Sequence, residues 1–84
     1  MNREIEVRNL AVDISEDDVK KLLAVVGRVL MIEMVPMQRS VKARVTLSVS
    51  DEATEAMRKL DHSRFLGRTI RVVPAKKTRQ SAIS

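Results

Sequence analysis

The sequence contains no cysteine, no tryptophan and no tyrosine, and Phe65 is its only aromatic residue. The lack of cysteine excludes disulfide bonds and thiolate sites, and it is usual for proteins of reducing compartments. No apolar run approaches the roughly 20 residues that span a bilayer, and the start of the chain shows no apolar region of a secretion signal. We therefore expect a cytoplasmic protein without a membrane partner.

The residues that usually carry catalysis are equally scarce. Gly27 and Gly67 are the only glycines, which excludes a glycine-rich phosphate-binding loop. His62 is the only histidine, and no nucleophile or carboxylate accompanies it at a useful spacing. No metal-ligand spacing occurs either. The sequence therefore predicts a protein that is not an enzyme and needs no cofactor or metal.

What the chain has in excess is positive charge. Its 84 residues carry a net charge of +5, and the pI of about 10.2 favours anionic partners. Residues 76–84 contain three basic residues and no acidic one, and we interpret them as a flexible basic tail. Residues 1–75 then hold 13 basic against 11 acidic residues, so an anion-binding surface must come from local clustering.

Two short segments alternate between apolar and polar residues, which is typical of strands with one buried face. In residues 40–47, Lys42, Arg44 and Thr46 fall on the polar side. In residues 5–10, the polar side holds Glu6 and Arg8. Further strands are predicted over residues 28–35 and 69–73, the latter with Arg71 on its polar side.

Two amphipathic helices separate these strands. The first is predicted to begin at Ser15, with Asp18 in capping-box spacing, and to end at Gly27 as the residue after the helix. The second is predicted over residues 51–60 with Ser50 as its N-cap. The resulting β-α-β-β-α-β order predicts an α+β, ferredoxin-like sandwich: a four-stranded antiparallel sheet with both helices on one face.

Two apolar features are interpreted as packing. Phe65 is expected to fill the core rather than to stack on a ligand. Met31, Met34 and Met37 are spaced by three residues along a strand and its loop, and we expect them to fill gaps rather than form a binding surface. The alternative is that Met31 and Val35 face outward from the strand instead of filling gaps.

With these elements in place, the sequence resembles the RNA recognition motif family. Residues 5–10 resemble the RNP2 hexamer, residues 40–47 resemble the RNP1 octamer, and Phe-Leu-Gly-Arg precedes the last strand. The resemblance covers residues 4–75, so we expect one such domain in residues 1–75, followed by the tail. It implies the strand order 4-1-3-2 and single-stranded RNA bound on the open face of the sheet.

The chain departs from the family at the three positions that usually carry base-stacking aromatics, which here hold Glu6, Lys42 and Arg44. A guanidinium plane can stack on a base and also reach phosphate, so Arg44 is the best replacement. We therefore expect weak binding of single-stranded RNA, or alternatively single-stranded DNA, with limited sequence specificity. The candidate RNA-binding residues are Glu6, Arg8, Arg39, Lys42, Arg44, Thr46, Arg71, Lys76 and Lys77.

Two other interpretations remain open. The cations of the open face could simply pair across strands with Glu6 and Glu33 in a solvated surface, and the tail could act only as a solubilising segment. The same fold could also serve as a protein-interaction module, or form a homodimer through the sheet, without binding RNA. An enzyme of the small acylphosphatase type shares the topology, but its phosphate loop is absent.

Overall fold

The computed structural model describes residues 3–75, and the expectations for Lys76, Lys77 and the rest of the tail lie outside this range. Its elements follow the predicted order, with one additional small hairpin. They are β1 (Glu4–Leu10), α1 (Glu16–Leu23), β2 (Val29–Pro36), β3 (Val41–Leu47), α2 (Ser50–Leu60), β4 (Arg64–Phe65), β5 (Arg68–Thr69) and β6 (Arg71–Pro74).

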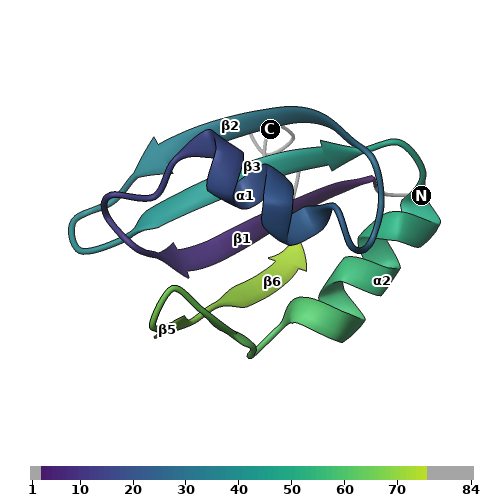
Figure 1. Ribbon diagram of the computed structural model, residues 1–84. Helices are drawn as coiled ribbons and strands as arrows, with labels where there is room; N and C mark the ends of the chain where they lie inside the picture. The colour runs from purple at the N-terminus through teal and green to yellow at the C-terminus, as the bar shows by residue number, and fades with distance from the viewer. Residues whose placement is uncertain (1–2, 76–84) are drawn as a thin grey trace, which may run out of the picture.

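Four of the strands form one antiparallel sheet in the order β2-β3-β1-β6. Since β6 is the fourth long strand of the chain, this is the expected order 4-1-3-2. Both helices lie on the same face of the sheet, and the opposite face carries no helix (Figure 1). The prediction of a ferredoxin-like α+β fold is confirmed.

The core lies between the sheet and the helices, because alternate residues of each strand point toward α1 and α2. In β3, for example, Ala43, Val45 and Leu47 are completely buried, whereas the residues between them are not. Val19 and Leu23 of α1 are also completely buried. Phe65 packs against this core, as expected.

Helix α1 has the predicted start but an earlier end. The Ser15 hydroxyl accepts a hydrogen bond from the Asp18 amide, and the Asp18 carboxylate accepts one from the Ser15 amide. The C-cap is Ala24, so the prediction that Gly27 directly follows the helix is wrong. Val26 nevertheless packs against the core from the turn that follows.

Gly27 is needed for space rather than for a left-handed conformation. A Cβ at this position would clash with Cδ of Glu52. The Glu52 carboxylate accepts hydrogen bonds from the Arg28 and Ser48 amides and from the Ser48 hydroxyl. These bonds, that of the Ser48 hydroxyl first, lower the pKa of Glu52 despite the opposing effect of burial.

Helix α2 begins at Ser50, and its N-cap is Val49, so the prediction of Ser50 as the N-cap is wrong. Residues 64–69 form the β4–β5 hairpin, which was not predicted, so Thr69 belongs to β5 rather than to the predicted strand over residues 69–73. The two central residues of the hairpin, Leu66 and Gly67, both have positive φ, at 51° and 83°. Positive φ at both central residues is typical of the two-residue type I′ hairpin turn.

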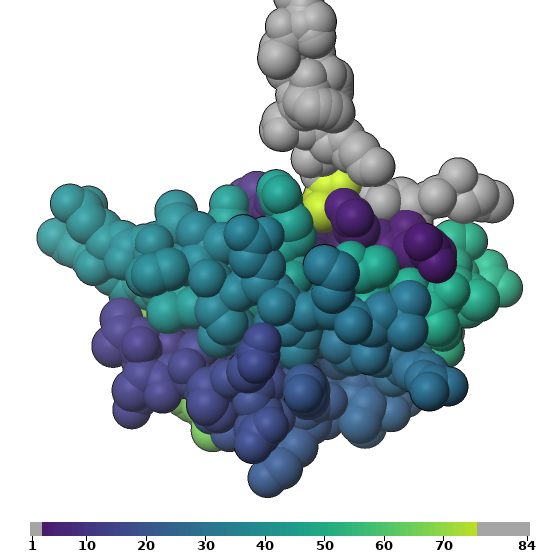
Figure 2. All heavy atoms as spheres, turned by 90° about the horizontal axis from the view of Figure 1, so that it is seen from above, coloured from purple at the N-terminus to yellow at the C-terminus, as the bar shows by residue number. Residues whose placement is uncertain are grey.

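The β2–β3 turn projects from the body of the molecule on the left of Figures 1 and 2. The turn is closed by a hydrogen bond from the Met37 amide to the Ser40 carbonyl, at 2.8 Å. Within residues 3–75, no helix combines the length and the apolar character needed to cross a membrane.

Candidate nucleic-acid interface

The sheet face opposite the helices is lined by the outward residues of β1, β2, β3 and β6. Strand pairing places Arg44 between Glu33 on β2 and Glu6 on β1, with Val73 of β6 beyond Glu6. Charges of opposite sign therefore alternate across the middle of this face. We call it the open face from here on.

Glu6 is the centre of this face. Arg8 donates to Oε1 of Glu6 through Nε at 3.0 Å and Nη2 at 2.9 Å. Arg44 donates through Nη2 to Oε2 at 3.3 Å, and Nζ of Lys42 lies 3.8 Å from the same oxygen. One carboxylate thus holds three cations together, and we call these four residues the Glu6 cluster.

Solvent reaches the members of the Glu6 cluster very unequally. Only 7% of the Glu6 side chain is exposed, against 56% for Arg8, 39% for Arg44 and 25% for Lys42. Burial raises the pKa of Glu6, but the hydrogen bonds from Arg8 and Arg44 and the nearby Lys42 charge outweigh it, so the pKa is lowered below 4.5. The carboxylate is therefore ionised at neutral pH, and the cluster carries a net charge of +2.

Arg71 belongs to the open face but not to the Glu6 cluster. It lies on edge strand β6, where its Nε donates to Oδ1 of Asp61 at 2.9 Å. Burial raises the pKa of Asp61, but the Val72 amide and Arg71, which both donate to it, lower the pKa overall. Arg71 is thus tied to the end of α2, away from the centre of the sheet.

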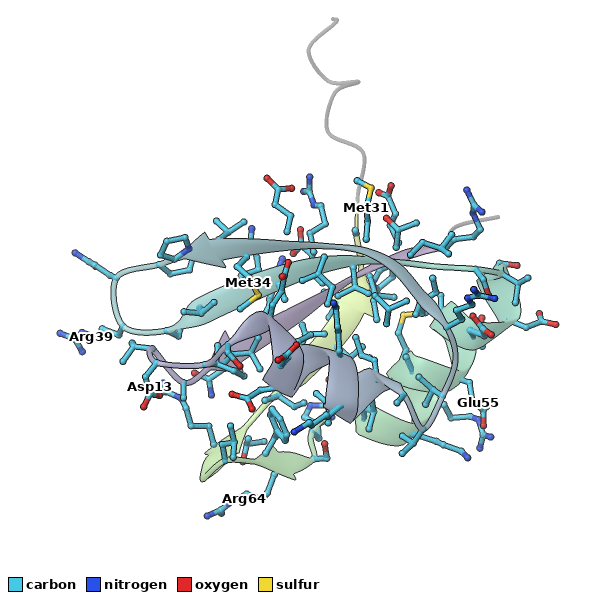
Figure 3. All side chains as sticks on the ribbon, turned by 45° about the horizontal axis from the view of Figure 1, so that its top comes forward. Asp13, Met31, Met34, Arg39, Glu55 and Arg64 are labelled. Atoms are coloured by element: carbon cyan, nitrogen blue, oxygen red, sulfur yellow. The ribbon has the colours of Figure 1, made fainter. Side chains whose placement is uncertain are left out.

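The remaining predicted residues lie at the margins. Thr46 faces outward beside Met31 of β2 and Glu4 of β1. Arg39 sits at the tip of the β2–β3 turn, and its side chain points away from the sheet (Figure 3). Lys76 and Lys77 are outside the described residues.

The methionines of β2 do not share one role. Met34 packs against the core, and in Figure 3 it lies on the opposite side of β2 from Met31. Met31 and Met37 are exposed by 67% and 52%, respectively. The interpretation of all three as packing residues is therefore wrong for Met31 and Met37, and the alternative of an outward Met31 is correct.

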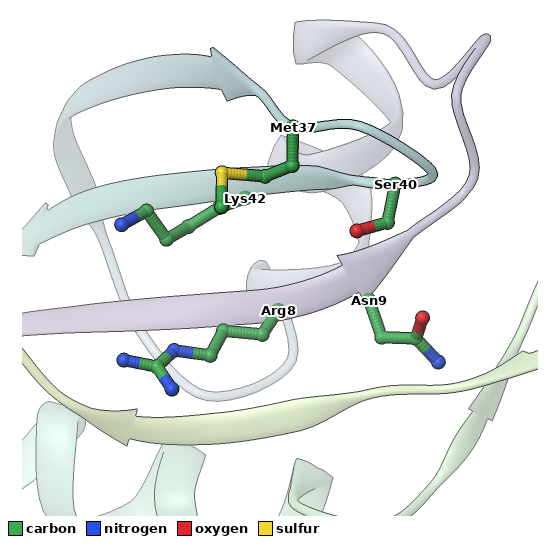
Figure 4. A pocket seen from close by; sticks show the side chains of 5 residues that line it. All are labelled: Arg8, Asn9, Met37, Ser40 and Lys42. Atoms are coloured by element: carbon green, nitrogen blue, oxygen red, sulfur yellow. The ribbon is translucent and has the colours of Figure 1, made fainter.

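Two shallow pockets flank the Glu6 cluster on the open face. The larger, of about 290 Å³, is lined by Arg8, Asn9, Met37, Ser40 and Lys42 (Figure 4). We call it the Met37 pocket. The other, of about 220 Å³, is lined by Glu4, Met31, Glu33, Arg44 and Thr46.

Asn9 gives the Met37 pocket a fixed wall. It has a φ of 67° at an irregularity in the β1–β3 pairing between Val7 and Leu10. Its Nδ2 donates to the Thr69 carbonyl at 2.8 Å, and its Oδ1 accepts from Arg68 at 2.9 Å. Sequence reasoning missed Asn9, Met37 and Ser40 as surface residues of interest. Of these, only Asn9 lies in a segment that the sequence analysis singled out, the RNP2-like residues 5–10.

A family model for the RNA recognition motif matches residues 5–71, which is most of the chain. The chain belongs to the RNA recognition motif family. This family is a non-enzymatic, nucleic-acid-binding domain, so membership supports RNA binding as the general function. The Glu6 cluster contains all three positions at which the family usually stacks bases on aromatic rings.

Solved structures of RNA recognition motifs agree with this assignment. The third such domain of Mip6 is 28% identical, with a TM-score of 0.84 over 88% of this chain and 93% of that one. The RNA-binding protein PG1 is 26% identical, with a TM-score of 0.80 over 90% of this chain and 96% of that one. The Rna15 domain with bound RNA (GU) is 17% identical, with a TM-score of 0.81 over 93% and 87%, and it shows the fold alone. No curated protein sequence matches the chain significantly.

Proposed function

We propose that this RNA recognition motif binds single-stranded RNA on its open face, weakly and with limited sequence specificity, through cations in place of aromatic rings. The observation that carries the proposal is the Glu6 cluster, in which Lys42 and Arg44 occupy the RNP1 stacking positions and remain partly exposed. Arg8 adds a third cation beside them. Thr46 and Arg71 extend the same surface toward its margins.

The pairing with Glu6 leaves the arginines able to bind. Arg44 uses only Nη2 for its hydrogen bond to Glu6 among residues 3–75, so its other N–H groups can meet a phosphate. A guanidinium bonded along one edge also keeps its flat faces available for stacking on a base. Glu6 thus holds the two arginines in a fixed orientation rather than occupying them fully.

The same carboxylate explains why binding should be weak. Base stacking on an aromatic ring contributes about 1–3 kcal/mol per base, and none of the three usual rings is present. Glu6 and Glu33 both lie beside Arg44 and repel phosphate. Attraction to the nucleic acid backbone is insensitive to sequence, so limited specificity follows.

Similar proteins support an RNA ligand. The related Rna15 structure contains bound RNA (GU), and another structure of this fold, at 23% identity, is from the yeast poly(U)-binding protein Pub1. PG1 is itself described as an RNA-binding protein. A single-stranded DNA of the same sequence would meet the same cations, and a direct competition between the two would rank them.

A protein partner, or a second copy of this chain, is the second candidate for the open face. It is favoured by the pairing of all three central cations with Glu6, and by the exposure of Met31 at 67%. Under this alternative, the open face would be covered in solution by protein rather than by RNA.

Fluorescence anisotropy with mixed-sequence single-stranded RNA tests the proposal. Arg44→Ala should weaken binding about 5- to 50-fold, because it removes a stacking plane and a cation that meets phosphate. The slope of log K against log salt should fall by about 0.7 for each phosphate that the variant no longer neutralises. Arg58→Ala is the matched control, since Arg58 is an exposed arginine on α2, paired with Glu55.

Equal binding by wild type and Arg44→Ala would rule out the open face as the RNA site. NMR chemical-shift mapping then separates the alternatives: shifts in β1 and β3 on adding RNA support the proposal. Concentration-dependent shifts on the same strands without RNA indicate self-association instead.

The tail is proposed as an auxiliary phosphate-binding segment through Lys76 and Lys77. A chain truncated after Ala75 should bind RNA more weakly and with a shallower salt dependence, because these lysines no longer release counterions from the RNA. Undiminished affinity of the truncated chain would instead indicate that residues 76–84 act only as a solubilising segment.

A further inference from the structure

The Met37 pocket contains groups that a phosphate would not need. Two of its lining residues, Arg8 and Lys42, are cations that also belong to the Glu6 cluster. The others offer a thioether, a hydroxyl and a carboxamide. A flat ring with a polar edge fits such a set, because methionine sulfur packs well on aromatic rings while hydroxyl and amide groups bond to ring edges.

We propose that the Met37 pocket holds one nucleobase of a bound single-stranded RNA, with the Met37 thioether against the face of the ring. This inference rests on the proposed RNA-binding function and assigns its base-contacting site. The base would sit at the end of the sheet where β1 meets the β2–β3 turn, beside Lys42 and away from Glu6 and Arg44 at the other two usual stacking positions.

The walls of the pocket are held in place before any ligand arrives. The Met37 amide donates to the Ser40 carbonyl at 2.8 Å and so fixes both residues at the mouth of the turn. Asn9 is fixed from the other side by Thr69 and Arg68. Preformed walls lower the entropy cost of binding a ligand.

Arg68 ties the two sides of this site together. Its Nη2 donates to Oδ1 of Asn9 and, at 3.4 Å, to the carbonyl of Arg39 in the β2–β3 turn. Arg68 follows the Leu66-Gly67 turn, and the β4–β5 hairpin therefore places Arg68 where it can hold the walls of the pocket in position. Arg68 is a positioning residue and does not line the pocket itself.

Polar groups remain available at the edge of a bound base. Among residues 3–75, the Ser40 hydroxyl has no hydrogen-bond partner, so it is free to donate or accept. The side-chain Nδ2 and Oδ1 of Asn9 each make one hydrogen bond and each retain capacity for a second. The volume of about 290 Å³ lies at the lower limit of the roughly 300–1,000 Å³ typical of small-molecule pockets, which suits a single base.

The test compares two RNA octamers on the full chain: a uridine octamer, and one with the same sugar-phosphate backbone but no bases. The wild-type protein should bind the uridine octamer more tightly. Met37→Ala should reduce this preference about 2- to 10-fold and leave affinity for the base-free octamer unchanged, because the substitution removes only the thioether that packs on the ring. Val25→Ala, an exposed apolar residue after α1, is the control and should change neither affinity.

Methyl NMR gives a second, local measurement. The chain has five methionines, and Met37→Ala identifies the Met37 signal. The uridine octamer should shift this methyl signal through the ring current of the base, and the base-free octamer should not. An adenosine octamer should shift it further, since its ring system is larger.

Two results would overturn the inference while leaving the proposed function intact. One is an unchanged preference for bases in Met37→Ala. The other is an equal loss of affinity for both octamers, which would indicate a structural effect of the substitution. If the wild-type protein binds neither octamer, the proposed function fails and this inference fails with it.

Discussion

The two faces of the sheet are built from the same strands, and yet they use burial in opposite ways. Toward the helices, residues such as Val7, Val45 and Leu47 are completely buried and apolar. On the open face lies Glu6, which among residues 3–75 is the only buried charged residue, and three cations surround its carboxylate. One face is held together by many interchangeable apolar side chains, and the other depends on a single charge.

This difference separates the requirements of the fold from those of the ligand. Any apolar residue of suitable size can serve on the helix side, because transfer from water is not directional. The open face instead requires one specific group in one place, since a buried carboxylate is tolerated only when it is paired. Substitutions on the helix side should therefore lower the stability of the fold, whereas substitutions on the open face should mainly change ion pairing and RNA binding.

The largest contrast is expected between neighbouring residues of β3. Leu47→Ala should lower the free energy of unfolding by about 2–5 kcal/mol, because Leu47 is completely buried. Thr46→Ala, on the open face, should change it by no more than about 0.5 kcal/mol. Urea denaturation at neutral pH measures both values. Similar losses in the two variants would show that the open face contributes to the core.

A smaller loss is expected from Glu6→Gln, which keeps the shape of Glu6 but removes its charge. It should lower the free energy of unfolding by about 1–2 kcal/mol, since charge-assisted hydrogen bonds from Arg8 and Arg44 weaken while both arginines stay in contact with water. RNA binding should become more salt-dependent, because the released cations become available to phosphate.

Glu33→Gln is the matched control for Glu6→Gln. Glu33 lies on the same face opposite Arg44, but it is exposed and forms no ion pair among residues 3–75. Both substitutions raise the net charge by one, so only an effect specific to Glu6 can separate them. Equal stability of the two variants would contradict a central role for Glu6.

The free energy of unfolding should depend on pH in acid, because the Glu6 carboxylate stabilises the fold only when it is ionised. The pKa of Glu6 is lower in the folded chain than the ordinary value of 4.5 that it has in the unfolded chain. At a pH between these two pKa values, the unfolded chain therefore binds more protons than the folded chain. The stabilisation from Glu6 is therefore complete above pH 4.5 and is lost as the pH falls through the pKa of Glu6 in the folded chain. Glu52 and Asp61, whose pKa values are also lowered, contribute equally in wild type and Glu6→Gln.

The difference between the two unfolding curves isolates Glu6. The stability gap between wild type and Glu6→Gln should be constant near neutral pH and should narrow in acid. A gap that stays constant well below pH 4.5 would contradict the lowered pKa of Glu6. A difference in free energy of unfolding that narrows near neutral pH would also contradict the lowered pKa of Glu6.

The alternation of apolar and polar residues predicted β1, β3 and their open face, whereas the strand order came from the resemblance to the RNA recognition motif family. This works because the buried side of a strand is set locally, residue by residue. Helix ends were less predictable. The role of Gly27 depends on Glu52, which is 25 positions away in the chain and reaches the glycine only in the folded state.

The members of the Glu6 cluster were predicted as outward residues of the sheet, but the geometry of the cluster was not. Outward positions identified Glu6, Lys42 and Arg44 as neighbours, whereas their convergence on one carboxylate depends on side-chain directions. The β4–β5 hairpin was missed because its strands have two residues each, and because Leu66 is an unusual residue for a positive φ. The Met37 pocket joins two segments, residues 8–9 and 37–42, that no local pattern connects.

The smallest effect is expected at the edge of the open face. Arg71→Ala should weaken RNA binding by no more than about two-fold, because Arg71 is already paired with Asp61 and lies on the outer strand β6. Asp61→Asn should have the opposite effect, since it releases Arg71 from a charged partner and lets it reach phosphate. Anisotropy titrations at low salt measure both changes, and Arg44→Ala provides the larger reference. If Arg71→Ala matched Arg44→Ala, binding would be spread evenly over the sheet, and the Glu6 cluster would lose its special place on the open face.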